Sequence, residues 1–328
     1  MMYSLLFILP FISAFTIKFN YKVPFICEVH DVNINKLDLD TMDNLKHLLR
    51  TTPVLVFKNQ QITPQKQFEF CSKFDTYHTN DIIHPFPETA IPDCPQVTLR
   101  GTGYIDNVFG VQNKTIHNGK MLQYTPVWQQ TLVGTRNREP SRINSIYMIN
   151  PSLHGGSIMF ASMEKAYENM GANAKRYKSL QACYSTKLAS SAVMDHSGYC
   201  RIDNYLSYNM ETFKTLQDDV VVQPLITYTE KTRRKETLML NPVKFCGFLG
   251  LPFEKSKHIM HRIMNEYVLT KHNVDEIQYE ANDFVLFDNR RVMHSSTPTR
   301  QISGSQIMSL LLLDTKEPIE PALPHPLL

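Results

Sequence analysis

The residues with the most obvious chemical potential in this sequence are twelve histidines and six cysteines. An imidazole and a carboxylate two positions apart on a strand lie on one face, where they can share a metal ion. No histidine has Asp or Glu two positions later; His78, His117, His154 and His196, for example, have Asn or Gly there. The dispersed cysteines include no C-x-x-C pair, so we interpret them as small buried side chains.

Composition and charge describe an ordinary globular protein. Hydrophobic residues make up 42% of the 328 residues and charged residues 20%, and the chain is long enough to bury a large core. The net charge of +3 gives no argument for a nucleic-acid partner. We interpret the basic run at residues 231–235 as the solvated tip of a hairpin.

Hydrophobic periodicity predicts strands and helices around one core. Strands are expected at Val54–Phe57 and at residues 142–149, 284–287 and 307–313. Helices are expected within residues 40–49, 63–74 and 255–269, with Asp40 or Thr41 as the cap of the first and Thr63-Pro64 as the start of the second. Residues 75–140 show no period and are interpreted as loops with short strands. Strands dominate the second half, which favours an antiparallel barrel or sandwich with helices outside.

Several segments share a pattern that extends over nearly the whole chain. They are residues 28–33, residues 54–64, residues 150–157, the hairpin segments within residues 223–242, and residues 283–294. In this order and spacing, they resemble the taurine dioxygenase/TfdA-like family of non-haem Fe(II)/2-oxoglutarate-dependent dioxygenases. The resemblance covers residues 15–313 and implies a mainly β fold with flanking helices, the double-stranded β-helix or jelly roll.

The resemblance also implies a specific chemistry. Members of the family hold Fe(II) with two histidines and one carboxylate and leave positions open for 2-oxoglutarate and O₂. An arginine pairs with the distal carboxylate of 2-oxoglutarate through its planar fork, and a threonine hydroxyl helps to hold it. Fe(II) and 2-oxoglutarate are therefore the cofactors that the family leads us to expect.

Carried over residue by residue, most of these groups are substituted. Trp128 matches the family's W-H-x-D motif, but Gln129 stands at the first histidine and Thr131 at the carboxylate, while the distal histidine is retained as His294. Ile158 stands at the threonine, and Ser305 or Gln306 stands at the arginine. Arg300, which is the only arginine after His294, falls in the expected turn, too early in the chain to replace the missing one.

Two functions remain open at this point. The first is a dioxygenase-fold protein that has lost ordinary catalysis and binds a small molecule in the former substrate pocket, or a protein. The second is an active oxidoreductase with a rearranged metal site that combines His294 with His154 or His117. Two of three iron ligands are missing, and loss of even an outer-shell partner costs about 10- to 100-fold in metal affinity. The first reading is therefore favoured, and the bound molecule is not identified by the fold.

We expect a single domain at residues 15–315, flanked by a short segment at each end of the chain. Residues 1–14 contain a short apolar block followed by Ser13 and Ala14, which is typical of a signal peptide, although no Lys or Arg precedes the block. The alternative is a buried first strand in a cytoplasmic protein. Residues 316–328 form a Pro-rich tail. In the secretory pathway, the sequon at Asn113 would become a glycosylation site.

We predict that residues 1–14 are removed and that the mature chain starts near Phe15. N-terminal sequencing of protein from its native source tests this, and an intact Met1 or Met2 would refute it.

Overall fold

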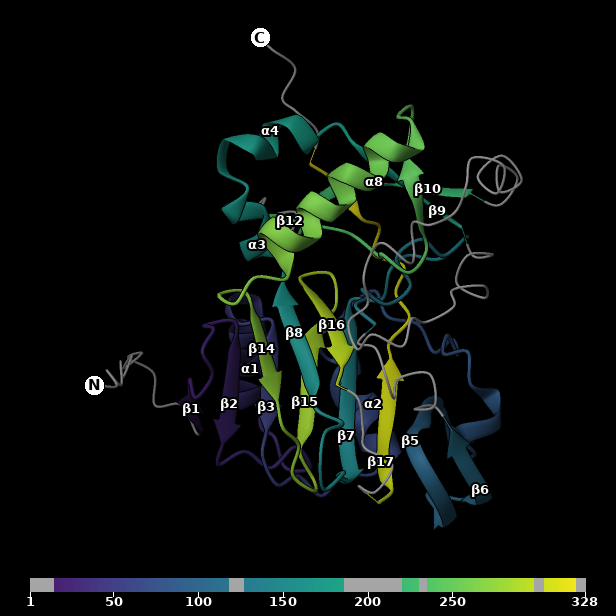
Figure 1. Ribbon diagram of the computed structural model, residues 1–328. Helices are drawn as coiled ribbons and strands as arrows, with labels where there is room; N and C mark the ends of the chain where they lie inside the picture. Colours follow the sequence, from purple (N-terminus) through teal and green to yellow (C-terminus); the bar gives the residue numbers. More distant parts are fainter. Residues whose placement is uncertain (1–14, 118–126, 186–219, 230–234, 298–303, 323–328) are drawn as a thin grey trace.

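The computed structural model describes residues 15–117, 127–185, 220–229, 235–297 and 304–322, and within them two facing sheets form the centre of the molecule (Figure 1). The large sheet has the order β1-β2-β3-β15-β7-β17-β5-β4, with β6 on β5. Its strands are β1 (Thr16–Lys18), β2 (Ile26–His30), β3 (Val54–Phe57), β15 (Phe284–Asp288), β7 (Ile143–Asn150), β17 (Gln306–Leu312), β5 (Cys94–Val108), β4 (Ala90–Ile91) and β6 (Val111–His117). The small sheet has the order β14-β8-β16, formed by β14 (Val274–Ile277), β8 (Ile158–Ser162) and β16 (Val292–Ser296).

The connections between these sheets make a double-stranded β-helix, as the resemblance implied. The chain passes from β7 to β8, from β14 to β15, from β15 to β16 and from β16 to β17, and each step changes sheet. All pairs among these strands are antiparallel. One parallel pair, β2 with β3, extends the large sheet at its N-terminal edge.

The remaining elements cover the two sheets. Two further three-stranded sheets are formed by β9 (Gln181–Ser185), β10 (Val220–Pro224) and β13 (Phe245–Phe248), and by β11 (Ile226–Tyr228), β12 (Glu236–Leu238) and β18 (Glu320–Pro321). The helices are α1 (Leu39–Thr51), α2 (Pro64–Ser72), α3 (Met163–Asn169), α4 (Ala174–Tyr177) and α8 (Phe253–Arg262), with the π-helix η4 (Ile263–Val268) and the 3₁₀ helices η1 (Pro87–Thr89) and η2 (Gly171–Asn173). Across the described ranges, none of the helices has the length and apolarity needed to cross a membrane.

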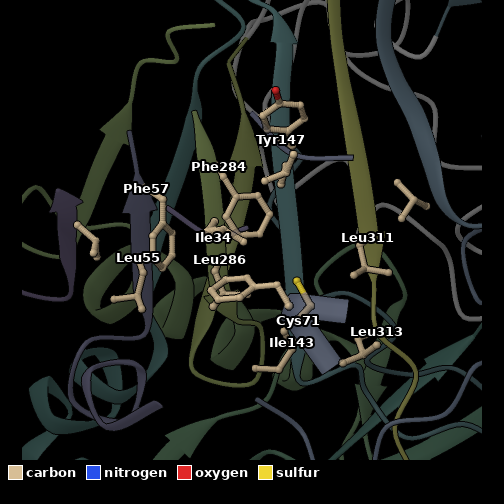
Figure 2. Packing of buried hydrophobic residues seen from close by; sticks show 14 of the residues in the cluster. Ile34, Leu55, Phe57, Cys71, Ile143, Tyr147, Phe284, Leu286, Leu311 and Leu313 are labelled. Carbon is tan, nitrogen blue, oxygen red and sulfur yellow. The ribbon is translucent and has the colours of Figure 1, made fainter. Parts of the chain in front are cut away.

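The central strands β3 and β15 of the large sheet are buried on both faces, which explains their continuous apolar runs. In β15, Phe284 and Leu286 belong to a core cluster shared with α1 and α2, whereas Val285 and Phe287 belong to the cluster between the two sheets. Figure 2 shows the first cluster, where Phe284 and Leu286 gather with Cys71 of α2. The five described cysteines are all free and buried, so they act as small core side chains.

Helix starts follow the expected chemistry, with one correction. Thr63 caps α2 by accepting a hydrogen bond from the Lys66 backbone N–H, as predicted. The cap of α1 is Asp38, whose Oδ1 accepts from the Thr41 backbone N–H at 2.7 Å, and not Asp40 or Thr41. The prediction was wrong because the apolar face of the helix was read from Met42 onward, although the first turn already begins at Leu39.

The interpretation of residues 75–140 as loops with short strands was wrong for residues 94–117, which form the long hairpin of β5 and β6. β5 is 15 residues long and pairs with β17 on one side and with β4 and β6 on the other. Gly101 hid this strand, because glycine normally weakens strand interiors. Here it has φ +130°, and an added Cβ would lie 1.8 Å from the carbonyl oxygen of Gln306. A glycine is therefore required where β17 approaches β5.

The four predicted strands and the three predicted helices lie close to their expected bounds. The third helix differs in kind, because α8 ends at Arg262 and continues as the π-helix to Val268. The basic run at residues 231–235 follows β11 and precedes β12, which form an antiparallel hairpin, while residues 230–234 lie outside the described part. Residues 1–14 and most of the Pro-rich tail also lie outside it.

We predict that Phe284→Ala destabilises the protein by about 3–5 kcal/mol, because the fully buried ring leaves a cavity between Phe57 and Phe70. Urea unfolding followed by circular dichroism measures the change. Leu153→Ala is the control, since Leu153 is 77% exposed and its truncation should change the free energy of unfolding by less than about 0.5 kcal/mol. Equal effects of the two variants would contradict the assignment of this core.

Candidate functional site

His294, the retained histidine, lies on β16 and faces the space between the two sheets. It pairs with Phe160 of β8, and its ring packs 6.2 Å from the Phe160 ring and 5.1 Å from the Phe287 ring, measured between centroids. Burial lowers the pKa of His294 to about 4, so the imidazole is neutral at physiological pH. Its Nδ1 is buried and has no hydrogen-bond partner among the described residues.

Gln129 lies directly opposite His294. The backbone N–H of Gln129 donates to the His294 carbonyl, and the N–H of His294 donates to the Gln129 carbonyl, both at 3.0 Å. An antiparallel pair that exchanges both hydrogen bonds places its two side chains on the same face of the sheet. The structure therefore brings together two of the positions that the resemblance assigns to metal ligands.

Thr131 is positioned by Asn289, in the turn between β15 and β16. The Asn289 Oδ1 accepts a hydrogen bond from the Thr131 backbone N–H at 2.7 Å, and its Nδ2 donates to the carbonyl oxygens of Thr131 and Ser141 at 3.0 and 2.8 Å. The side chain of Gln130 donates to the Asn289 carbonyl at 3.1 Å. The sequence pattern included Asn289, but its role in joining these segments was not predicted.

The positions expected to hold the distal carboxylate of 2-oxoglutarate form a neutral lining. Ile158 is buried at the start of β8 and belongs to the cluster between the sheets. The Gln306 side chain is buried and donates to the Gly156 carbonyl at 2.6 Å. Ser305 instead accepts from the Asn150 side chain at 2.8 Å. Gln306, rather than Ser305, therefore contacts Gly156 in the turn that precedes Ile158, while Arg300 lies outside the described residues.

These residues do not fit the iron that the fold implies. Gln129 and Thr131 supply neither an imidazole nor a carboxylate opposite His294, and the described ranges contain no group of three His, Cys, Asp or Glu side chains that could hold a metal ion. His154 is exposed in the turn before β8. The backbone of His117 ends β6, and its side chain is not described. The rearranged set proposed from the sequence is therefore not assembled by the described side chains.

Comparison with known proteins gives a family match over most of the chain. The sequence profile described as "Taurine catabolism dioxygenase TauD, TfdA family" matches residues 20–308. The domain bounds of 15–315 remain a prediction.

Two curated relatives are 2-oxoglutarate-dependent enzymes. The alpha-ketoglutarate-dependent xanthine dioxygenase xanA of Emericella nidulans is 34% identical over 100 residues, covering 27% of each chain, so the match spans about a quarter of that enzyme. The (S)-phenoxypropionate/alpha-ketoglutarate-dioxygenase of Sphingobium herbicidovorans is 23% identical over 247 residues, covering 75% of this chain and 76% of that enzyme.

Solved structures share the fold at low identity. AAD-2 in complex with Mn(II) and N-oxalylglycine superposes with a TM-score of 0.63 at 16% identity, covering 93% of this chain and 98% of that one. A putative alpha-ketoglutarate-dependent taurine dioxygenase from Burkholderia xenovorans gives a TM-score of 0.69 at 14% identity, covering 94% and 93%. At such identities the similarity shows the jelly-roll fold and not the activity.

We predict that His294 makes the protein less stable in mild acid. The pKa of His294 is about 4 in the folded protein and 6.5 in the unfolded chain. As the pH falls from 6.5 to 4, the unfolded state therefore binds the proton first. The folded state should lose up to about 3 kcal/mol over this window. In His294→Gln, which does not titrate, this part of the pH dependence should disappear.

The measurement is urea unfolding at several pH values between 4 and 7. His258→Gln is the matched control, because His258 is an exposed histidine on α8 and should leave the slope unchanged. An identical slope in the wild-type and His294→Gln proteins would contradict a buried neutral His294.

Proposed function

Because this chain belongs to the taurine catabolism dioxygenase TauD, TfdA family, we propose that it is a member that has lost iron- and 2-oxoglutarate-dependent oxidation and acts by binding a small molecule inside the jelly roll. The observation that carries the proposal is the pair formed by Gln129 and His294. The two strands meet as the metal-ligand positions should, but one of the two side chains is a neutral amide.

The loss of charge supports this proposal. A divalent iron site uses imidazole nitrogens and a carboxylate oxygen, whereas a glutamine amide and a threonine hydroxyl offer only weak neutral donors. Thr131 adds no negative charge, and its backbone polar groups are already bonded to Asn289. Because the substituted positions come from separate segments, no single exchange restores the site.

The scaffold supports a binding role, because its stability rests on other contacts. The two sheets enclose an apolar cluster that includes Ile158, Phe160 and Phe287, and hydrophobic side chains from both sheets make up this packing. Loss of the iron ligands therefore leaves the fold intact, with an interior whose lining has changed from charged to neutral around His294. We further propose that the ligand is small, that nucleic acid is not a partner, and that the protein enters the secretory pathway.

One observation favours the alternative of an active oxidoreductase that uses His294. Its Nδ1 is buried and has no hydrogen-bond partner in the described part of the chain, and its lowered pKa keeps the imidazole in the neutral form that binds metals. A ligand supplied from outside the described residues would then be needed.

We predict that the purified protein binds Fe(II) weakly and does not convert 2-oxoglutarate to succinate. The test is an anaerobic Fe(II) titration, followed by a succinate assay after O₂ is admitted. Tight binding of one iron per chain together with succinate release would overturn the proposal and support the alternative.

A constructive variant tests the reason for the weak binding. Gln129→His combined with Thr131→Asp should increase Fe(II) affinity at least about tenfold, because it returns an imidazole and a carboxylate opposite His294. The control carries Asn at both positions, which changes the same sites without adding a metal ligand or a charge. If the wild-type protein already binds iron as tightly as the constructive variant, the substitutions do not explain its chemistry.

A further inference from the structure

Arg100 on β5 faces the interior of the jelly roll. On this strand Val97 and Leu99 belong to the cluster beneath α1 and α2, so the alternate residues Thr98 and Arg100 face the other side of the sheet. The cross-strand partner of Arg100 is Met308 of β17, which packs on the cluster between the two sheets. Figure 1 shows β5 beside β17 in the large sheet.

The guanidinium of Arg100 is held in place but is not neutralised. It lies over the ring of Phe86, 3.5 Å from the centroid, which fixes the plane of the fork. Its Nη1 is buried and has no hydrogen-bond partner among the described residues. Burial lowers the pKa of Arg100 to about 10, and the charge of Glu88 opposes this shift, but no ion pair joins these two residues within the described part. Arg100 therefore remains a cation at physiological pH with an unused donor.

The buried arginines Arg290 and Arg291 have specific partners. Arg291 forms a fork-to-fork pair with Glu164 at 2.7 and 3.0 Å. Arg290 donates to the carbonyl oxygens of Pro140 and Glu317, at 2.9 and 2.6 Å. Arg100 is half-buried, and its buried Nη1 has no such partner among the described residues, so the lost hydration of this group is not replaced. Arg100 thus differs from these structural arginines and has the properties of a ligand-binding group.

We propose that Arg100 forms an anion site inside the jelly roll, which binds the carboxylate of a small organic acid. The positive charge then comes from β5, whereas the β17 position that contacts Gly156 holds the neutral Gln306. Phe86 covers one face of the guanidinium, which leaves the edge with its N–H donors to form charge-assisted hydrogen bonds with a carboxylate. The thioether of Met308 suits an apolar carbon chain next to that group. This inference rests on the proposed binding function and names the class of ligand.

The test is calorimetric titration of the metal-free, full-length protein with succinate, in buffer containing a chelator and fixed chloride. Succinamide serves as the neutral ligand of similar shape. We expect saturable binding of succinate and none of succinamide. Arg100→Met should weaken succinate binding by about tenfold or more, as expected for a charge-assisted hydrogen bond. Arg176→Met, which removes an exposed arginine from α4, should bind like the wild-type protein.

Thermal unfolding separates this role from a structural one. Without ligand, Arg100→Met should melt at or above the wild-type temperature, because it removes a half-buried charge that has no ion-pair partner among the described residues. Succinate should raise the melting temperatures of the wild-type and Arg176→Met proteins more than that of Arg100→Met. A lower melting temperature together with unchanged succinate binding would overturn the inference, as would no binding of succinate by the wild-type protein. Iron-dependent release of succinate from 2-oxoglutarate would instead overturn the proposed function. That activity assay is separate from the titration of the metal-free protein with succinate, so the two failures can be distinguished.

Discussion

The side-chain amide of Asn289 fixes the geometry on which the interior of this protein depends. It accepts one hydrogen bond from Thr131 and donates to Thr131 and Ser141, so one turn holds both the segment before β7 and the segment that faces β16. A buried amide of this kind is stable only when its donors and acceptor are satisfied, and here all of its partners are backbone groups. These bonds constrain the backbone and not a side chain. Position 129 therefore lies opposite His294 whichever residue occupies it.

Buried ion pairs around the same turn add to this constraint. Arg291 reaches Glu164 at the start of α3 and the carbonyl oxygen of Leu49 at the end of α1, and Arg290 reaches the segments before β7 and after β17. Breaking such a pair leaves an uncompensated charge, which costs about 3–5 kcal/mol, so each partner is difficult to replace alone. The metal ligands are under no comparable structural constraint. A chain of this fold can therefore lose its iron ligands and keep the arrangement of strands that once presented them.

The sequence predicted those parts of the fold whose signal is local. β3 and β15 are buried on both faces and read as continuous apolar runs, and Thr63-Pro64 begins a helix through its own chemistry. β5 was missed because it contains Gly101 and lies near the edge of its sheet, where polar and apolar residues are mixed. At the site, the order of the family segments was sufficient to place Gln129 near His294. The roles of Asn289 and Arg100 were not predictable, because they depend on hydrogen bonds and strand pairing between segments far apart in the chain.

The sign of the charge in the interior connects these observations. His294 is neutral because its pKa is about 4, Gln129 and Gln306 carry amides, and Thr131 stands where the family places its carboxylate, so none of these positions carries a charge. Arg100 keeps its positive charge on the same side of the large sheet. In a medium of low dielectric constant, an unpaired cation disfavours the approach of a second cation and favours an anion. Under the function proposed here, the unpaired cation of Arg100 gives the interior an electrostatic preference for a carboxylate, and this preference requires no metal ion to bridge ligand and protein.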